Sequence, residues 1–312
     1  ILDLLSEILF SPLIDDEGFE KNTFEIEKKQ VLTRLESEFE DPFFFANKEL
    51  DHLYFEDPSM QLVPEDLITR ISEESPNTCF TSFQKMLKED RIDIFFLGDF
   101  NEIEILEYIK QAPFTARQRT VNIQYQQPYS NVIKENFARK SLGQSIIEMG
   151  YHCSVGYGDE QQMTMIVVNG LLGAFPHSKL FTVIREKEAL AYTISSHIDF
   201  FSGCLRLYAG IDRSNRNRVR KLMNQQLHDI KNGKFTDLEI NQTKKMIKRS
   251  LMLAQDNQDS IIDRTYLRHY FGKIALDIPT MLEKLELVGK NEICEAASNL
   301  KLQAIYFMEG VE

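Results

Sequence analysis

The feature that most constrains this chain is the run at residues 178–192, SKLFTVIREKEALAY. It predicts an apolar helix that leads into a strand-rich segment, with Arg185 and Tyr192 seven residues apart near its end. Seven residues are close to two helical turns, so a guanidinium and a phenol can be presented on one side of the element. Such a pair can hold a peptide carbonyl, through a charge-assisted bond from Arg185 and an O–H donated by Tyr192. Taken alone, an Arg and a Tyr at this spacing are more often ordinary surface residues.

Hydrophobic patterning along the rest of the chain predicts an α+β protein. The opening region shows the apolar stripes of several helices, followed by a short buried strand at 92–97. Further on, we expect a strand at 162–169, a helix at 178–191 and a hairpin formed by 192–199 and 203–211. The capping box Thr236-x-x-Glu239 predicts the start of a long helix. Strands followed by helices favour sheets with helices packed on one face.

A polar, Gln-rich stretch at 113–130, with Pro113 and Pro128 near its ends, predicts a linker between two domains. At 312 residues the chain is long enough for two packed cores. We therefore expect two tandem domains of related topology, each with an antiparallel-rich sheet. The first would end at residue 112 and the second would span 131–312.

The run at 178–192 resembles the second-half signature of the pitrilysin/insulinase-like zinc peptidases (family M16), which include the mitochondrial processing peptidases. In that family a small-residue loop, here GLLGAFPHS at 170–178, precedes the helix, and an Arg-Glu…Leu-Ala-Tyr run closes it. The similarity continues in the family's order through FEIEKKQVL at 24–32, FSG at 201–203, YAGI at 208–211 and TDLE at 236–239. We expect Gly170 and Gly173 to form a strand-to-helix corner with positive φ, an ordinary loop being the alternative.

The resemblance also allows the zinc site to be tested. Active members carry H-x-x-E-H on a helix, and a third ligand, Glu, lies seven residues after the Glu of a Glu–Lys start. This sequence contains no H-x-x-E-H, and counting seven from Glu27 gives Arg34, whose guanidinium cannot ligate zinc. Glu36 and Glu38 are out of phase by two and four residues, although a slipped register would bring in Glu38. The resemblance therefore implies no metal site in this chain and a first domain that is incomplete at its N-terminal side.

Composition limits the possible binding partners, the cellular location and the possible metal sites of this chain. The net charge of −12 argues against nucleic acid and suits basic or extended peptides. No apolar stretch approaches the ~20 residues of a membrane span and no signal peptide is recognised, so we expect a protein of the bacterial cytoplasm. No two cysteines form C-x-x-C and no two histidines lie three or four residues apart, which predicts reduced thiols and no local zinc helix. These residues are Cys79, Cys153, Cys204 and Cys294, and His52, His152, His177, His197, His228 and His269.

For function, the resemblance implies that this chain is one subunit of a two-subunit zinc peptidase, namely the subunit that does not bind the zinc. Arg185 and Tyr192 would be its catalytic and substrate-binding residues, acting on a peptide held at the zinc of an M16-like partner. The partner would form a heterodimer with this chain, or be a second copy of it in a homodimer, and we expect the chain to be inactive alone. Two alternatives remain: a scaffold homologue without activity, like those of respiratory complexes, or a zinc peptidase whose H-x-x-E-H lies before Ile1.

Overall fold

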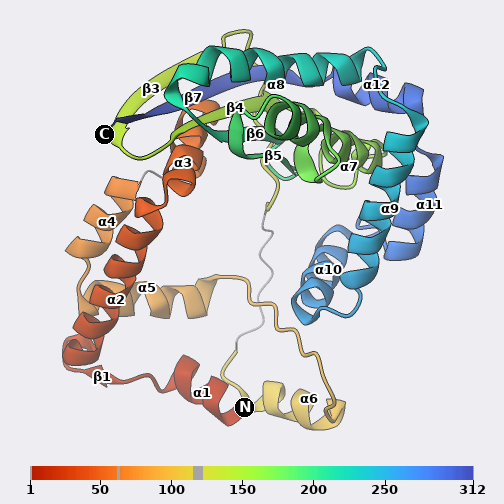
Figure 1. Cartoon of the computed structure of the whole chain (residues 1–312). Coiled ribbons are helices and arrows are strands. Elements are labelled where there is room, and N and C mark those ends of the chain that lie inside the picture. Colours follow the sequence, from red (N-terminus) through yellow and green to blue (C-terminus); the bar gives the residue numbers. More distant parts are fainter. Residues whose placement is uncertain (1, 62–63, 115–121, 312) are drawn as a thin grey trace. The chain divides into compact units, whose positions relative to one another are not determined.

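The computed structural model describes residues 2–61, 64–114 and 122–311, and the chain divides into two compact units (Figure 1). Unit 1 comprises Ile1–Asp41 and Pro64–Asn122, and unit 2 comprises Pro42–Val63 and Ile123–Glu312. This division describes spatial contacts. The assignment of 1–112, 113–130 and 131–312 to a first domain, a linker and a second domain of the family stays a prediction.

Unit 1 is built almost entirely from helices. The backbone of α2 (Lys21–Glu40) begins at Glu20, whose carboxylate accepts the N–H groups of Asn22 and Thr23. The Nζ of Lys28 ties this helix to the C-terminal end of α4, through the carbonyls of Ser72 and Glu74 at 2.7 and 2.8 Å. The elements of this unit are α1 (Leu2–Phe10), the antiparallel pair β1 (Ile14–Asp15) and β2 (Gly18–Phe19), α2, α4 (Pro64–Glu73), α5 (Pro76–Glu89) and α6 (Glu102–Gln111).

Unit 2 is organised around a five-stranded sheet in the order β3-β7-β4-β6-β5. Only the β3–β7 pair is parallel among these strands, so the sheet is antiparallel-rich as predicted. The predicted hairpin is present as β5 (Ala191–Asp199) and β6 (Cys204–Ile211), and β5 forms one edge of the sheet. The other strands are β3 (Lys134–Ser141), β4 (Ser145–His152) and β7 (Lys301–Val311). The α+β class inferred from the sequence is thereby confirmed.

Both faces of the central strands are buried, each in its own apolar cluster. Alternate residues of β4, such as Ile147 and Met149, pack with the helices on one face. The residue between Ile147 and Ser145, Ile146, points to the opposite cluster with Tyr306 of β7. That second face is covered by α3 (Pro42–Tyr54), which supplies Leu50, Tyr54 and neighbouring residues. The sequence had indicated helices on one face only, and α3 was assigned to the first domain.

The helices of the larger cluster complete unit 2 (Figure 1). The capping box at Thr236 is confirmed: its Oγ1 accepts the N–H of Glu239 at 3.2 Å, while the Glu239 carboxylate accepts the N–H of Thr236 at 2.7 Å. The helices that contribute to this cluster are α7 (Gln162–Asn169), α8 (Arg216–Lys231), α9 (Asp237–Leu253), α11 (Ile278–Leu287) and α12 (Lys290–Ser298). Unit 2 also contains α10 (Gln258–Phe271), which has no buried residue. Short 3₁₀ turns lie at Pro58–Met60, Arg213–Asn215 and Gly272–Ile274.

Two predicted strands are wrong. Residues 162–169 form the helix α7 instead of a strand. Met163, Met165 and Val167 alternate along the sequence like the inward residues of a strand, but they are buried because the helix is covered on several sides. Residues 92–97 have no regular structure. Conversely, the region 132–147 shows no clear periodicity in the sequence, yet it contains β3 and the start of β4. Burial of β4 on both faces removes the polar–apolar alternation by which a half-buried strand is recognised.

The predicted linker lies partly outside the described residues, at 115–121. Its later part is held on unit 2. The N–H of Tyr125 donates to the carbonyl of Phe201 at 2.9 Å, and the N–H of Gln127 donates to that of Ser202 at 3.3 Å. The side chain of Gln127 is buried, and its Oε1 accepts the N–H of Glu56 at 2.9 Å. This segment is therefore a fixed part of unit 2 from Tyr125 onward.

Candidate functional site

Arg185 lies on a π-helical segment, Phe181–Lys187, rather than on a regular α-helix. The wide turn is closed by the N–H of Glu188, which donates to the carbonyl of Val183 at 3.0 Å. Ile184 is fully buried and anchors the segment in the core, while Arg185 beside it is exposed. Its guanidinium lies over the ring of Phe181, 4.6 Å from the centroid. π-Helical turns are rare and occur frequently at functional sites.

The chain between Arg185 and Tyr192 contains a second irregularity. Ala189 has φ of 50°, which is uncommon for a residue other than glycine. This left-handed residue ends the π-helical segment and turns the chain into β5, where Ala191 begins the strand. A non-glycine residue in this region is held there by its surroundings at a cost of about 1–3 kcal/mol.

A third irregularity places Tyr192 itself. Ala191 pairs with Ile211 of β6, and Thr193 pairs with Gly210, so Tyr192 is the extra residue of a β-bulge. Bulges re-aim a side chain, and Tyr192 is 59% exposed although both neighbouring strand positions are paired.

The hydroxyl of Tyr192 donates to Oδ1 of Asp212 at 3.0 Å. This bond, together with the negative charge of Asp212, raises the pKa of Tyr192 above its ordinary value. A tyrosine is already protonated at neutral pH, and the raised pKa keeps its O–H as a donor at higher pH as well. Asp212 was missed by sequence reasoning. The available signal was its position directly after β6, the strand that pairs with β5.

Asp212 also faces a pocket of about 390 Å³ at this end of the sheet. Arg213 and Ser145 line the same pocket, together with the backbone of Gly310. The oxygen of Ser145 accepts the N–H of Gly310 at 3.0 Å, which joins β4 and β7 at this point. The Tyr192–Asp212 pair thus stands beside a polar hollow rather than on a flat surface.

Arg185 and Tyr192 are not presented by one helix, and that part of the prediction is wrong. They lie on successive elements, a π-helical segment and an edge strand, separated by the turn at Ala189. The contacts found among the described residues give each its own neighbour, Phe181 for Arg185 and Asp212 for Tyr192. Their assignment to catalysis and substrate binding stays a prediction.

The glycines before this segment act through close packing and not through positive φ. Gly170 and Gly173 belong to another π-helical segment, Gly170–Ala174, and neither has a left-handed backbone. A Cβ on Gly173 would lie 2.6 Å from Oγ and 2.7 Å from the backbone N of Ser196 on β5. The expected strand-to-helix corner is wrong, because the helix α7 precedes these glycines and continues into them.

The position expected for the third zinc ligand holds Arg34, which is exposed on α2 of unit 1. Glu36 and Glu38 are exposed on the same helix. Within residues 2–61, 64–114 and 122–311, no three His, Cys, Asp or Glu side chains gather in a way that could hold a metal ion. Nor does any helix in this part of the chain have the length and apolarity to cross a membrane.

Two of the four cysteines lie in the apolar clusters of unit 2, and His177 is half-buried. Cys153 and Cys204 are buried free thiols, and burial raises their pKa values to about 11 and about 12. His177 bonds to Oγ1 of Thr243 at 2.9 Å, and burial lowers its pKa. None of these groups faces Arg185 or Tyr192 in the contacts described above.

An antiparallel-rich sheet, covered by helices and leading through a π-helical segment into a bulged edge strand, defines an M16-like peptidase fold. The family model "Peptidase M16 inactive domain" matches residues 81–247. The chain belongs to the M16 peptidase family, through the domain that this description calls inactive.

Individual relatives agree with this assignment. The chain is 26% identical to "Probable inactive metalloprotease YmfF" of Bacillus subtilis, over 100% of this chain and 73% of that protein. It is 40% identical to a conserved protein from Enterococcus faecalis V583, whose crystal structure matches with a TM-score of 0.95 over 99% of this chain and 73% of that one. A peptidase M16 inactive domain from Pseudomonas fluorescens shares the fold, with a TM-score of 0.77 at 14% identity over 100% of this chain and 74% of that chain.

Proposed function

We propose that this chain supplies Arg185 and Tyr192 to the hydrolysis of a peptide whose scissile bond is held at the zinc of a partner subunit. The observation that carries the proposal is the bulge at Tyr192, which turns a phenol outward and sets its O–H on Asp212. A scaffold gains nothing from a bulge that exposes a tyrosine, whereas a substrate-binding surface needs such an outward donor.

The role proposed for each residue follows from the hydrogen bonds that its side chain can donate or accept. Tyr192 would give its O–H to the oxyanion that develops when the peptide carbonyl is attacked, a contribution typically about 10²–10³ in turnover. Arg185 would hold a peptide carbonyl of the substrate by charge-assisted hydrogen bonds. Asp212 would keep the phenol oriented and protonated until substrate arrives.

The metal would come from the partner, an M16-like subunit that carries zinc. Support for the absence of a zinc ligand here is the cation Arg34 at the position where the family pattern requires Glu. Metal analysis after dialysis tests this directly: stoichiometric zinc bound through α2 of the purified chain would contradict the proposal. A bacterial cytoplasmic location fits the bacterial origin of the relatives and can be tested by cell fractionation.

Reconstitution tests the function. The chain is mixed with zinc-bearing M16-like subunits encoded in the same genome, and cleavage of a fluorogenic peptide library is measured. We expect the mixture to cleave peptides that neither chain cleaves alone, and the double variant Arg185→Ala/Tyr192→Phe to abolish the gain. A matched control is Arg249→Ala/Tyr266→Phe, which changes the same residue types on α9 and α10.

A second candidate is a catalytically inactive partner that contributes structure alone. It is favoured by the name of the relative YmfF, "Probable inactive metalloprotease", and by the acceptor that Tyr192 already has within its own chain. The same reconstitution separates the two. A complex that assembles and cleaves equally well with the double variant would establish the structural role.

A further inference from the structure

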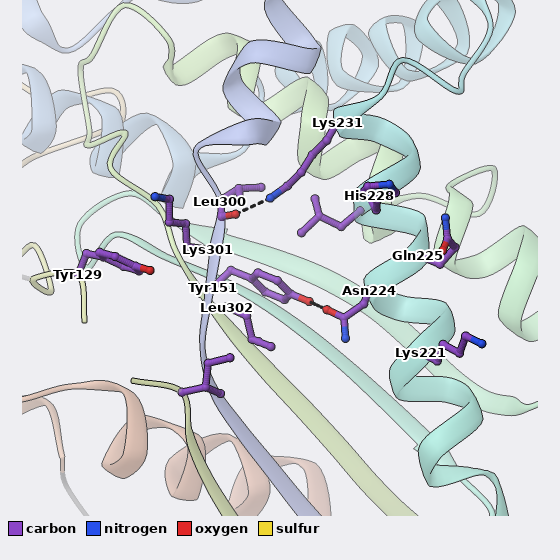
Figure 2. A pocket seen from close by; sticks show the side chains of 12 residues that line it. Tyr129, Tyr151, Lys221, Asn224, Gln225, His228, Lys231, Leu300, Lys301 and Leu302 are labelled. Carbon is purple, nitrogen blue, oxygen red and sulfur yellow. Dashed lines mark hydrogen bonds between the residues drawn. The ribbon is translucent and has the colours of Figure 1, made fainter. Parts of the chain in front are cut away.

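A second hollow lies in unit 2 on residues that the Arg185/Tyr192 site does not use. It is a pocket of about 770 Å³ between α8, the start of β7 and the end of β4 (Figure 2). Figure 2 shows α8 along one side of it, with Lys221, Asn224 and Lys231 on this helix, and Leu300 to Leu302 at the centre. Tyr129 closes the opposite side.

The floor of the pocket is apolar and rigid. Tyr151 of β4 is 2% exposed, and Leu227 and Leu300 are similarly buried, at 3% and 1%. The hydroxyl of Tyr151 is fixed by Asn224, whose Oδ1 lies 2.9 Å away. The floor can therefore accept a flat or apolar group without first rearranging.

The rim is cationic and carries no acid. Lys221, Lys231 and Lys301 line the pocket, and none of its lining residues is Asp or Glu, in a chain whose net charge is −12. None of the ion pairs found within the described residues involves these lysines. Three lysines without an acid among the lining residues give the rim a positive potential, although the protein as a whole is acidic.

Lys231 is the most constrained of the three cations. Its Nζ donates to the carbonyl of Leu300 at 2.6 Å, which directs the ammonium to the pocket wall. Burial, with the neighbouring charge of Lys301, lowers the pKa of Lys231. A partly buried cation beside a like charge is unfavourable unless an anion joins it.

Tyr129 adds an aromatic wall. The Nζ of Lys301 lies 5.0 Å from its ring centroid, and the ring of His152 is 5.6 Å from it. The Tyr129 side chain is 43% exposed, so part of its ring is open to a ligand. A planar group placed over the floor would find Tyr129 as a neighbour and Lys301 within reach of its charge.

We propose that this pocket binds a small organic anion, with its carboxylate or phosphate at Lys231 and Lys301 and its aromatic or apolar body on the floor of Tyr151 and Leu300. The site is independent of the proposed peptidase role, since it shares no residue with the Arg185/Tyr192 segment. Tight binding requires both the anionic group and the apolar body of the ligand. An inorganic anion would contact only the lysines, and a neutral aromatic molecule would contact only the apolar floor.

Calorimetric titration of the full chain tests the proposal with four probes: phenyl phosphate, benzoate, inorganic phosphate and phenol. We expect phenyl phosphate or benzoate to bind at least about tenfold more tightly than inorganic phosphate or phenol, because only they engage rim and floor together. Whichever of the two binds more tightly identifies the anionic group. Methyl signals of Leu227, Leu300 and Leu302 should shift on binding in an NMR titration.

Charge-removing variants locate the site. Lys301→Gln, at an exposed position that tolerates substitution, should weaken binding about tenfold, and Lys231→Gln by a similar factor. Lys245→Gln on α9, also exposed, should leave it unchanged. Equal binding of phenyl phosphate and phenol, no binding at millimolar concentration, or equal loss in Lys245→Gln and Lys301→Gln would each overturn the proposal.

Discussion

Unit 1 and unit 2 differ sharply in how much side chain they bury. Among the described residues, all buried side chains of the two apolar clusters belong to unit 2. The helices α1, α2, α5 and α6 of unit 1 contain no buried residue. Unit 1 has well-formed caps and helices, but its apolar residues, such as Ile8 and Ile103, stay exposed. Local sequence signals can therefore specify helices without providing a core.

This difference between the units indicates which of them can hold a functional site. A site needs side chains held by rigid surroundings, and unit 2 supplies them through a sheet packed on both faces. Arg185 and Tyr192 are exposed but adjoin fully or almost fully buried residues, Ile184 and Ala191. Arg34 on α2 has no such support. The experiments below test this difference between the units, from the largest expected effect to the smallest.

The largest effect is expected from truncating a leucine in each unit. Leu207 of β6 is 0% exposed, whereas Leu106 of α6 is 54% exposed. Leu207→Ala should lower the free energy of unfolding by about 2–5 kcal/mol, because it leaves a cavity in the main cluster. Leu106→Ala should change it by less than about 0.5 kcal/mol. Urea unfolding measures both, and comparable losses would remove the distinction between the units.

A smaller and local effect is expected at Gly18, a buried residue of unit 1. Its φ is +128°, and a Cβ there would lie 2.6 Å from the carbonyl oxygen of Pro76 at the start of α5. Gly18→Ala should destabilise this unit by about 1–3 kcal/mol. Gly143→Ala, where a Cβ meets nothing within 4 Å, is the control.

Hydrogen exchange shows where the Gly18→Ala loss falls. Amides of α2 and α5 should exchange faster, while those of β4 and β6 keep their protection. Faster exchange throughout both units would show that they unfold as one cooperative body, against the contrast drawn here.

A third effect depends on pH and concerns Glu148, a buried residue of β4 that lies near the charges of Arg206 and of Asp51 on α3. Burial raises the pKa of Glu148 to about 8, against the opposing charge of Arg206. Because the folded-state pKa lies above the unfolded value of 4.5, folding favours the protonated acid. Stability from this group is therefore present below pH 4.5 and is lost as pH rises through about 8.

Glu148→Gln removes the ionising group and keeps its shape. At about pH 9 the variant should be more stable than the natural chain by about 1–3 kcal/mol, and the difference should shrink toward about pH 5. Melting temperatures across this range provide the measurement, with the exposed Glu286→Gln as control. A variant that is less stable than the natural chain at about pH 9 would mean that the Glu148 carboxylate is needed by Arg206.

The sequence predicted correctly those helices and strands whose signals come from residues close together in the chain. The helix starting at Thr236 follows from a capping box that closes within three residues, and the β5–β6 hairpin follows from alternation along one strand. Helix α7 and strand β4 were misread or missed because burial from several sides erases the pattern that periodicity detects.

The candidate site shows the same limit. Arg185 and Tyr192 could be selected from the run that contains them, but the bulge depends on the register with Ile211 and Gly210 of β6. The acceptor Asp212 lies 20 residues away in sequence and becomes a neighbour only when the two strands pair. Positions could therefore be predicted from local sequence, whereas orientations and partners could not.

The central claim is that Tyr192 is a donor for catalysis and contributes little to the fold. The most direct measurement compares Tyr192→Phe with the natural chain in a complex reconstituted with the zinc-bearing subunit proposed above, recording kcat for peptide cleavage and the Tm of the chain alone. The exposed bond to Asp212 adds little stability, so we predict an almost unchanged Tm and a kcat lowered by about 10²–10³. An unchanged kcat in an intact complex would contradict the claim and leave Tyr192 as an ordinary surface residue.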